Sequence, residues 1–163
     1  MFKSTVSVLV AAFVLSPVAL AEGSKEVTLS HTYDAALLET DTGAATLIGT
    51  SGLTSFTNLG WDSLAEVMYA TNSGTDSFYT MNLATGATTL VGPLSGPTNP
   101  NGLAFDPLTD TLYLVDNTTD NFYSINRVTG AATLIGATGS GNLLGLAWID
   151  GPIPVELQSF EIE

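Results

Sequence analysis

The chain contains no cysteine, one histidine and three basic residues among its 163 residues. Without cysteine it can form neither a disulfide framework nor a thiolate metal site. A Ser-His-Asp triad would have to use His31, and no nucleophile elbow or oxyanion motif lies near that residue in the sequence. We therefore interpret His31 as a residue of the surface or of the core edge, and we expect stability to come from apolar burial and strand pairing.

The shortage of positive charge leaves 16 acidic residues largely unbalanced and gives the chain a net charge of −13. Such a surface repels nucleic acid and anionic lipid, so we expect no nucleic-acid partner. Divalent cations, proteins and carbohydrates are compatible with this charge. Charged residues make up only 12% of the chain, but its apolar residues are abundant and alternate with polar ones, which excludes a disordered chain.

A single long apolar run is present, and it lies at the N-terminus. The run "STVSVLVAAFVLSPVALA" follows a lysine and ends on a small-x-small triplet just before Glu22. Pro17 interrupts it, which argues against a membrane span of about 20 apolar residues. The pattern predicts a secretory signal peptide at residues 1–21, and hence a secreted or periplasmic protein with no membrane attachment after cleavage.

The octet "TGAATLIG" occurs at residues 42–49, returns as "TGATTLVG" at 85–92, and occurs again at 129–136. A fixed period of about 40 to 45 residues is typical of four-stranded propeller blades. Each Thr-Gly lies between two predicted strands, where a tight turn needs the positive φ that glycine adopts without steric cost. We interpret the octet as a hairpin turn followed by the outermost strand of a blade.

Each period divides into four short runs of β-branched, leucine and aromatic residues, bounded by turn residues, which predicts an all-β protein. The two complete copies place these runs at residues 58–62, 66–71, 78–83 and 87–92, and at 101–106, 111–116, 122–128 and 131–136. The first run carries a recurring aromatic, as Trp61, Phe105 and Trp148. We interpret the recurring aromatics as a core between blades rather than as platforms for sugar stacking.

The segments "GLAFDPLTDTLYLVDN" and "FYSINRVTGAATLIG" resemble the blades of secreted bacterial β-propellers, whose layout is similar to that of WD40 and NHL repeats. The resemblance extends over about residues 26–150. It implies that "GLAFD" is the innermost strand of a blade and "TGAATLIG" the outermost. Because propellers carry many unrelated functions, the resemblance implies architecture and not activity.

The ends of the repeat region, residues 22–151, are out of phase with the blades. Residues 26–32 match a second strand, and residues 145–150 match a first strand with no complete blade after it. About three blades are therefore present in circularly permuted order, whereas rings have about four to eight. We expect either part of a longer propeller or half of a six-bladed ring, closed as a homodimer by exchange of end strands. Residues 152–163 resemble the first strand of a β-sandwich module and equally suit an edge strand.

A candidate calcium site lies in the loop "DNTTDN", where Asp116, Thr118 and Asp120 alternate as oxygen donors. The counterpart loop "NSGTD" places Asn72 and Asp76 similarly. Calcium takes about 6 to 8 oxygen ligands. The glycine and the distant glutamate of a complete calcium loop are missing, so an ordinary polar turn is the alternative. No other cofactor is predicted.

The acidic residues show no spacing that singles out a catalytic pair, and no catalytic residue is assigned. We therefore expect an exported binding or scaffold protein, not an enzyme, with a protein or carbohydrate ligand. The alternative is a propeller lyase or glycosidase. That alternative would require polar groups at the entries of the inner strands, such as Asn58, Asn101 and Asn142, to converge on a central channel.

Overall fold

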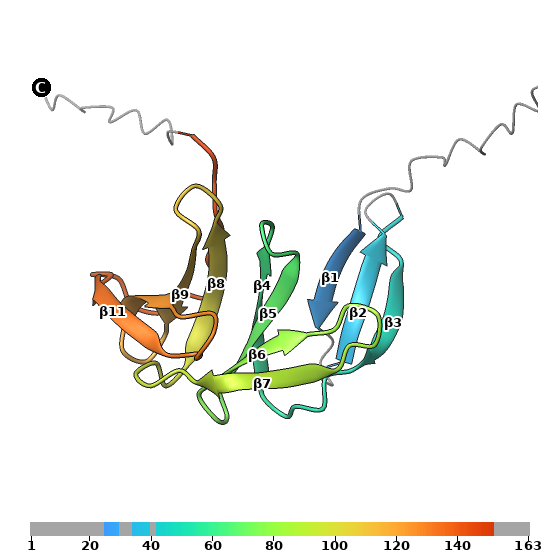
Figure 1. Ribbon diagram of the computed structural model, residues 1–163, viewed down its shortest axis with the longest axis horizontal. Helices are drawn as coiled ribbons and strands as arrows, with labels where there is room; N and C mark the ends of the chain where they lie inside the picture. The colour runs from blue at the N-terminus through green and yellow to red at the C-terminus, as the bar shows by residue number, and fades with distance from the viewer. Residues whose placement is uncertain (1–24, 30–33, 40–41, 152–163) are drawn as a thin grey trace, which may run out of the picture.

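The structure is a computed structural model that describes residues 25–29, 34–39 and 42–151. Every regular element in these residues is a β-strand, as predicted. Figure 1 shows three sheets that follow one another in chain order around an arc. No helix in the described residues is long and apolar enough to cross a membrane. The predicted signal peptide, His31 and the tail at residues 152–163 lie outside the described residues.

Each sheet is an antiparallel meander, and we name the sheets blades A, B and C. Blade A has three strands, β1 (Lys25–Leu29), β2 (Asp34–Glu39) and β3 (Ala45–Thr50). Blade B has four, β4 (Phe56–Asp62), β5 (Val67–Asn72), β6 (Ser77–Met81) and β7 (Thr88–Pro93). Blade C has β8 (Pro100–Asp106), β9 (Thr111–Asp116), β10 (Asn121–Ile125) and β11 (Ala132–Ala137).

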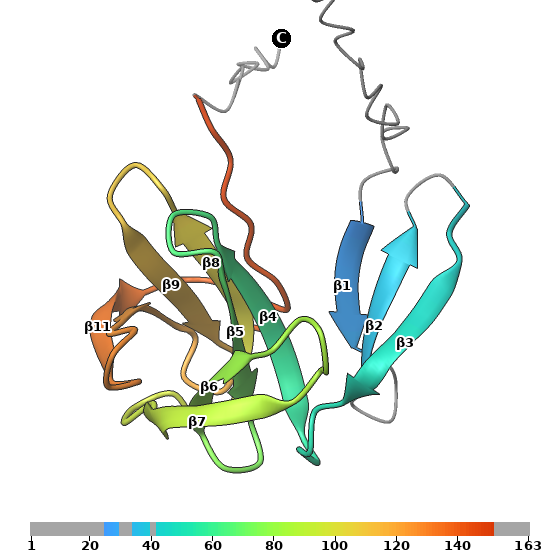
Figure 2. The ribbon, with the colours of Figure 1, turned by 45° about the vertical axis from the view of Figure 1, so that its right-hand side comes forward.

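The strand order agrees with the predicted permutation for blades A to C, because among the described residues β1 pairs only with β2 and blade A has three strands. Figures 1 and 2 show β4 and β8 side by side in the middle of the molecule, with β3, β7 and β11 at its periphery. The innermost and outermost positions thus agree with the resemblance to propeller blades.

The third strand of each complete blade ends earlier than predicted. β10 ends at Ile125, because the side chain of Asn126 accepts hydrogen bonds from the N–H groups of Val128 at 2.9 Å and Thr129 at 3.0 Å. Asn82 closes the corresponding turn of blade B in the same way. Asparagine side chains that bond to the backbone two or three residues later favour a turn over a strand.

The first glycine of each octet has the predicted turn conformation. The φ angles of Gly43, Gly86 and Gly130 are 69°, 72° and 80°, values that residues with a Cβ atom rarely adopt. The octet therefore begins with a tight turn in all three blades.

The last glycine of an octet packs against the Thr-Gly turn of the next blade. A Cβ atom at Gly49 would overlap the carbonyl oxygen of Thr85, and one at Gly92 would overlap that of Thr129. In the reverse direction, a Cβ atom at Gly86 would lie 2.7 Å from the carbonyl oxygen of Gly49. We call this arrangement the glycine contact. It requires glycine because two backbones approach without room for a side chain.

The apolar core lies between blades. The cluster between blades B and C is the larger, and its buried members are Tyr69, Phe78, Leu94, Leu103, Phe105, Leu112, Leu114, Tyr123 and Ile125. The described buried members of the cluster between blades A and B are Ala35, Ala70 and Met81. Ala35 of blade A occupies the position of Phe78 in blade B.

The aromatic residues of the inner strands form core only in part. Phe105 is 5% exposed, as predicted, but Trp61 and Trp148 remain 42% and 40% exposed. Trp61 lies on the same face of β4 as Leu59, which packs toward blade A. Phe105 is covered by Tyr69 and Phe78 of blade B, whereas blade A has the small Ala35 at the position of Phe78.

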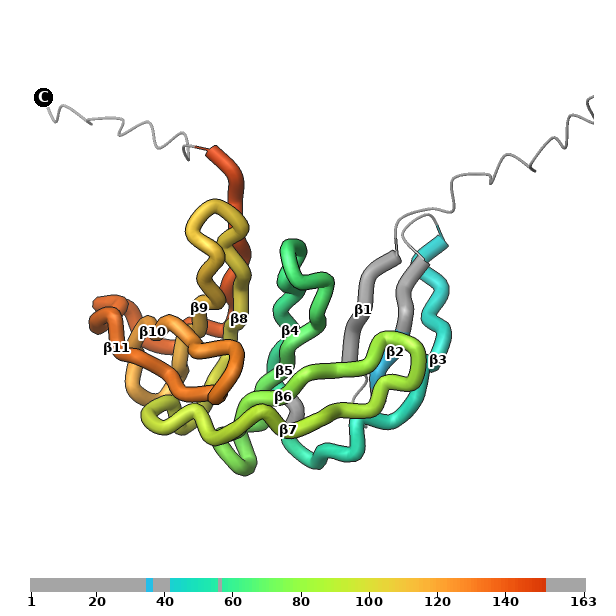
Figure 3. Tube along the Cα trace, in the orientation of Figure 1, coloured from blue at the N-terminus to red at the C-terminus, as the bar shows by residue number. Residues whose placement is uncertain are grey.

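Residues 145–150 do not form the predicted first strand. They carry no strand assignment, although the segment from residue 141 to 150 runs beside β8 (Figures 1 and 3). A Cβ atom at Gly102 would lie 2.8 Å from the backbone nitrogen of Leu146, so the contact with β8 is close. A first strand pairs with the second strand of its own blade. The one described second strand with a free inner edge, β1, lies at the other end of the arc.

Candidate functional site

Blade C presents a face that no further blade covers among the described residues. On this face Tyr113 of β9 and Phe122 of β10 stack, with ring centroids 5.1 Å apart and ring planes 17° apart. Tyr113 pairs with Ser124, so it lies diagonally across the ladder from Phe122, a position from which aromatic rings can touch. Both rings, together with Trp148, line a mostly apolar cavity of about 280 Å³. We call this surface the open face.

The open face has a buried counterpart in blade B. There Tyr69 and Phe78 occupy the equivalent positions and stack at 5.0 Å and 16°. They are 7% and 0% exposed, because Leu103 and Phe105 of blade C pack against them. The open face is therefore built like the surface that binds the next blade, and only the segment from residue 141 to 150 lies over it.

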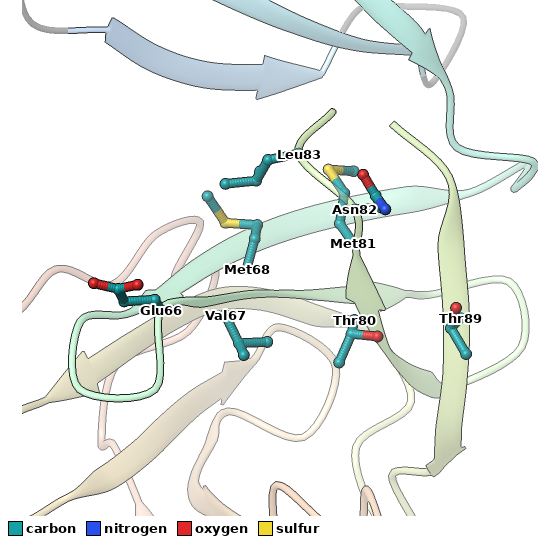
Figure 4. A pocket seen from close by; sticks show the side chains of 8 residues that line it. All are labelled: Glu66, Val67, Met68, Thr80, Met81, Asn82, Leu83 and Thr89. Carbon is teal, nitrogen blue, oxygen red and sulfur yellow. The ribbon is translucent and has the colours of Figure 1, made fainter. Parts of the chain in front are cut away.

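Two grooves in the described part of the chain recur with the repeat, and both enclose a larger volume than the cavity of the open face. The groove on blade B encloses about 510 Å³ and is lined by residues of β5, β6 and the following turn. Figure 4 shows Met68 and Leu83 on one side of this groove and Thr80 on the other. A groove of about 400 Å³ occupies the same positions of blade C, with Arg127 in place of Leu83. A groove that repeats from blade to blade follows from the blade geometry and does not mark a dedicated site.

Arg127, in the turn after β10, joins blade C to blade B. Its guanidinium donates to Oδ2 of Asp62 at the end of β4, and it donates to Oδ1 of Asp110 at 2.6 Å. The guanidinium carbon lies 5.2 Å from the ring centroid of Phe105. The Asp62 side chain is 0% exposed and that of Asp110 is 61% exposed. Asp62 is therefore the buried partner of Arg127, and Asp110 the exposed one.

The charges of this ion pair stabilise each other. Burial raises the pKa of Asp62. The hydrogen bonds from the N–H of Ala65, the guanidinium of Arg127 and the N–H of Leu64 lower the pKa by more than burial raises it, so the pKa lies below its ordinary value. Burial lowers the pKa of Arg127, but the hydrogen bonds to Asp62 and Asp110 hold it above its ordinary value. Both groups are thus charged at neutral pH.

Asp116, the first of the calcium candidates, is 1% exposed and accepts five hydrogen bonds within the chain. Its Oδ1 accepts from the N–H of Thr118 at 3.1 Å and from the N–H and hydroxyl of Thr119 at 2.8 and 2.9 Å. Its Oδ2 accepts from the N–H groups of Thr98 and Asn99 at 2.8 and 2.6 Å. Asp116 therefore closes its own turn and fastens the linker between blades B and C.

The hydrogen bonds of Asp116 also explain its acidity. Burial raises its pKa, but the N–H groups of Asn99 and Thr119, the hydroxyl of Thr119 and the N–H of Thr98 lower it below the ordinary value. Asp120 follows in the same turn with a φ of 52°. In the described part of the chain, no three His, Cys, Asp or Glu side chains are grouped as metal ligands. These contacts favour a turn, and the calcium site with Thr118 and Asp120 stays a prediction.

Among the described acidic residues, Asp76 is the one with a buried carboxylate oxygen, Oδ1, that lacks a hydrogen-bond partner. Burial raises its pKa, and the negative charge of Asp116 raises it further. The charged form of Asp76 is therefore unfavourable in the fold at neutral pH.

The asparagines at the entries of the inner strands take part in backbone and strand contacts. Asn58 donates to the carbonyl oxygen of Pro100 at 2.8 Å, which links β4 to β8. Asn101 donates to Asn99 in the preceding turn. Asn142 is exposed, with a φ of 59°. Each of these three asparagines thus has its own local surroundings, and their contacts do not bring them together at a central channel, as the enzyme alternative would require.

Two features of the site are not apparent from the sequence patterns alone, namely the Arg127 ion pair and the open face. The sequence does single out Arg127 as a candidate for an ion pair, because it is the one basic residue in the complete blades and occupies the position of Leu83 in the preceding copy. The open face could have been inferred from the aromatic pairs of the third strands, because the last pair has no blade after it.

No family model and no curated protein matches the sequence. Among solved structures, the chain is similar to a crystal structure of a nidogen/laminin complex, with a TM-score of 0.56, 20% identity, and coverage of 69% of this chain and 43% of that chain. It is also similar to a structural-genomics protein of unknown function from Bacteroides thetaiotaomicron, with a TM-score of 0.54, 21% identity, and coverage of 68% and 29%. The chain thus spans less than half the length of these two neighbours.

These similarities agree with the sheets of the structure. The structural neighbours are propeller proteins, and this chain is all-β with four-stranded antiparallel blades. At about one fifth identity they define the fold and not the activity. The described residues therefore have the fold of part of a β-propeller.

Proposed function

We propose that this chain is an exported, non-catalytic binding or scaffold protein that binds a protein partner through the open face of blade C. The observation that carries the proposal is the equivalence of Tyr113 and Phe122 to Tyr69 and Phe78. The same aromatic arrangement is buried by the following blade in blade B, whereas in blade C it is half-buried and covered only by the segment from residue 141 to 150. Apolar surface of this kind is favourably buried against another protein.

The surroundings of the open face support a protein ligand over a carbohydrate. Asp106 is the one charged residue that lines the cavity. Its carboxylate already accepts from the N–H groups of Leu108 and Thr109 and from the hydroxyl of Thr109. Sugars need several free hydrogen-bonding groups, whereas a protein surface needs mainly apolar area there.

The state of the buried carboxylates supports a non-catalytic role. Asp62, Asp106 and Asp116 each close a turn through backbone N–H groups. Their bonds leave these oxygens occupied, whereas a general acid or base needs a free position toward a substrate. The acidity of the buried groups is thus explained by the fold itself.

A site-specific photo-cross-linking experiment tests the proposal. Benzoylphenylalanine replaces Phe122 on the open face, and in a control chain it replaces Leu90, which is 58% exposed on the outermost strand β7. Both chains are expressed in the native host with their N-terminal segment, irradiated, and analysed by mass spectrometry. We expect an identified protein adduct at position 122 and none at position 90. No protein adduct at position 122, or equal adducts at both positions, would contradict the proposal.

A further inference from the structure

We infer that the protein partner is a second copy of this chain, and that two copies close one six-bladed ring. The inference rests on the proposed function, because it names the occupant of the open face. It is carried by three features that are complete between neighbouring blades and, among the described residues, incomplete at blade A and at blade C.

The first feature is the glycine contact. Gly49 meets the Thr-Gly turn of blade B, and Gly92 meets that of blade C. In the described part of the chain, nothing lies within 4 Å of the Cβ position of Gly136, the equivalent glycine of blade C, or of that of the turn glycine Gly43 in blade A. One copy therefore offers an unused glycine and an unused turn, and these are the two halves of one more contact.

The second feature is strand pairing. Blade A lacks its innermost strand, and β1 leaves its inner edge unpaired among the described residues. The segment from residue 145 to 150 has the sequence of an innermost strand, lies beside β8 and pairs with no strand. When the segment of one copy pairs with β1 of the other, blade A becomes a complete four-stranded blade. Unpaired edges of this kind favour association with another chain.

The third feature is the surface that is covered where two blades meet, which we call a junction. In blade B the aromatic pair is buried by the following blade. In blade C the equivalent pair, Tyr113 and Phe122, is covered only by the segment that would form the innermost strand of the next blade. Blade A of a second copy supplies the remaining three strands. Figure 1 shows blade C, which carries the open face, and blade A at opposite ends of the arc, so each copy offers one of each.

This complementarity defines a closed dimer. The open face of the first copy receives blade A of the second, and the open face of the second receives blade A of the first. A two-fold axis relates the two junctions, and no unpaired blade remains. Six blades lie within the range of about four to eight found in propeller rings.

The experiment measures the mass of the mature chain in solution by light scattering and sedimentation, over a range of micromolar concentrations. The test variant is Gly136→Val. It places a side chain in the free space of one copy, where nothing lies within 4 Å, but against the Thr-Gly turn in the dimer. The control variant is Ala137→Val, at the adjacent exposed residue of β11, whose side chain points to the other side of the strand.

We expect a dimer for the wild-type chain and for Ala137→Val, and at least a tenfold weaker dimer for Gly136→Val with an unchanged circular dichroism spectrum. A dimer that Gly136→Val leaves unaffected, or open-ended oligomers, would overturn the ring. A wild-type monomer would also overturn it. If position 122 still cross-links to a different protein, the proposed function stands alone; if it cross-links to nothing, both fail.

Discussion

Replacing Arg127 by methionine should destabilise the fold strongly, through the carboxylate that it leaves behind. Methionine keeps much of the apolar stem but removes the donors, so Oδ2 of the fully buried Asp62 loses the partner that the structure shows. Removal of one member of a buried ion pair costs about 3 to 5 kcal/mol. Because Oδ1 of Asp62 keeps its bonds to Leu64 and Ala65, we expect the low end, about 3 kcal/mol.

The pH dependence separates this effect from lost packing. The folded pKa of Asp62 lies below its ordinary value of 3.8, so its contribution to stability is present above that pH and is lost as the pH falls through the folded pKa. The ion pair contributes to this depression. The difference in unfolding free energy between wild type and Arg127→Met should therefore be largest near neutral pH and shrink as the pH falls below the ordinary pKa of 3.8.

Urea denaturation followed by circular dichroism measures both quantities. The control is Asp110→Asn, which removes the exposed partner of Arg127 and should cost less than about 1 kcal/mol. The variant Asp62→Asn combined with Arg127→Met should lose less than the sum of the single changes, since no charge is left buried. A loss below about 0.5 kcal/mol for Arg127→Met at neutral pH, or an equal loss at acid pH, would refute the reasoning.

Three further outcomes are expected. The exported protein should have the intact mass of a chain that begins near Glu22, and a mass that includes residues 1–21 would contradict the predicted signal peptide. Chelation of calcium should leave the melting temperature unchanged, because the oxygens of Asp116 are occupied by the chain; a fall that calcium reverses and Asp116→Ala abolishes would establish the metal site. The variant Asp76→Asn should raise the melting temperature at neutral pH and leave it unchanged at low pH. The folded pKa of Asp76 is raised, so its ionisation costs stability once the pH exceeds the ordinary pKa. Thermal denaturation of wild type and variant at both pH values measures the difference.

The fold could be predicted from the sequence because the same short-range chemistry occurs in each copy. A Thr-Gly turn at Gly43, Gly86 and Gly130 and alternating apolar residues define each hairpin locally, and the structure has the same strands in the same order. The error at residues 145–150 has a non-local cause. That segment has the sequence of an inner strand, but a strand also needs a partner edge, and the described chain offers none within reach.

The chemistry of the site could not be predicted in the same way, because it depends on contacts between blades. The loop sequence around Asp116 does not reveal that its carboxylate accepts hydrogen bonds from the N–H groups of Thr98 and Asn99 in the linker between blades B and C. Arg127 reaches Asp62 across 65 positions of sequence. Periodicity defines what a blade is, whereas such pairs depend on which blades become neighbours.

The salt dependence of association follows from where the ion pair lies. Arg127 and Asp62 connect blades B and C inside one copy, and the position that corresponds to Arg127 is Leu83 in blade B and Thr40 in blade A. The junctions between copies therefore contain no equivalent ion pair. Each copy carries a net charge of −13, so two copies repel each other, and added salt screens this repulsion. We expect the dissociation constant of the dimer, measured by sedimentation, to fall as salt is added. A dissociation constant that rises with salt would instead require attractive charge pairs between the copies, and would contradict junctions made of glycine contacts, strand pairing and apolar burial.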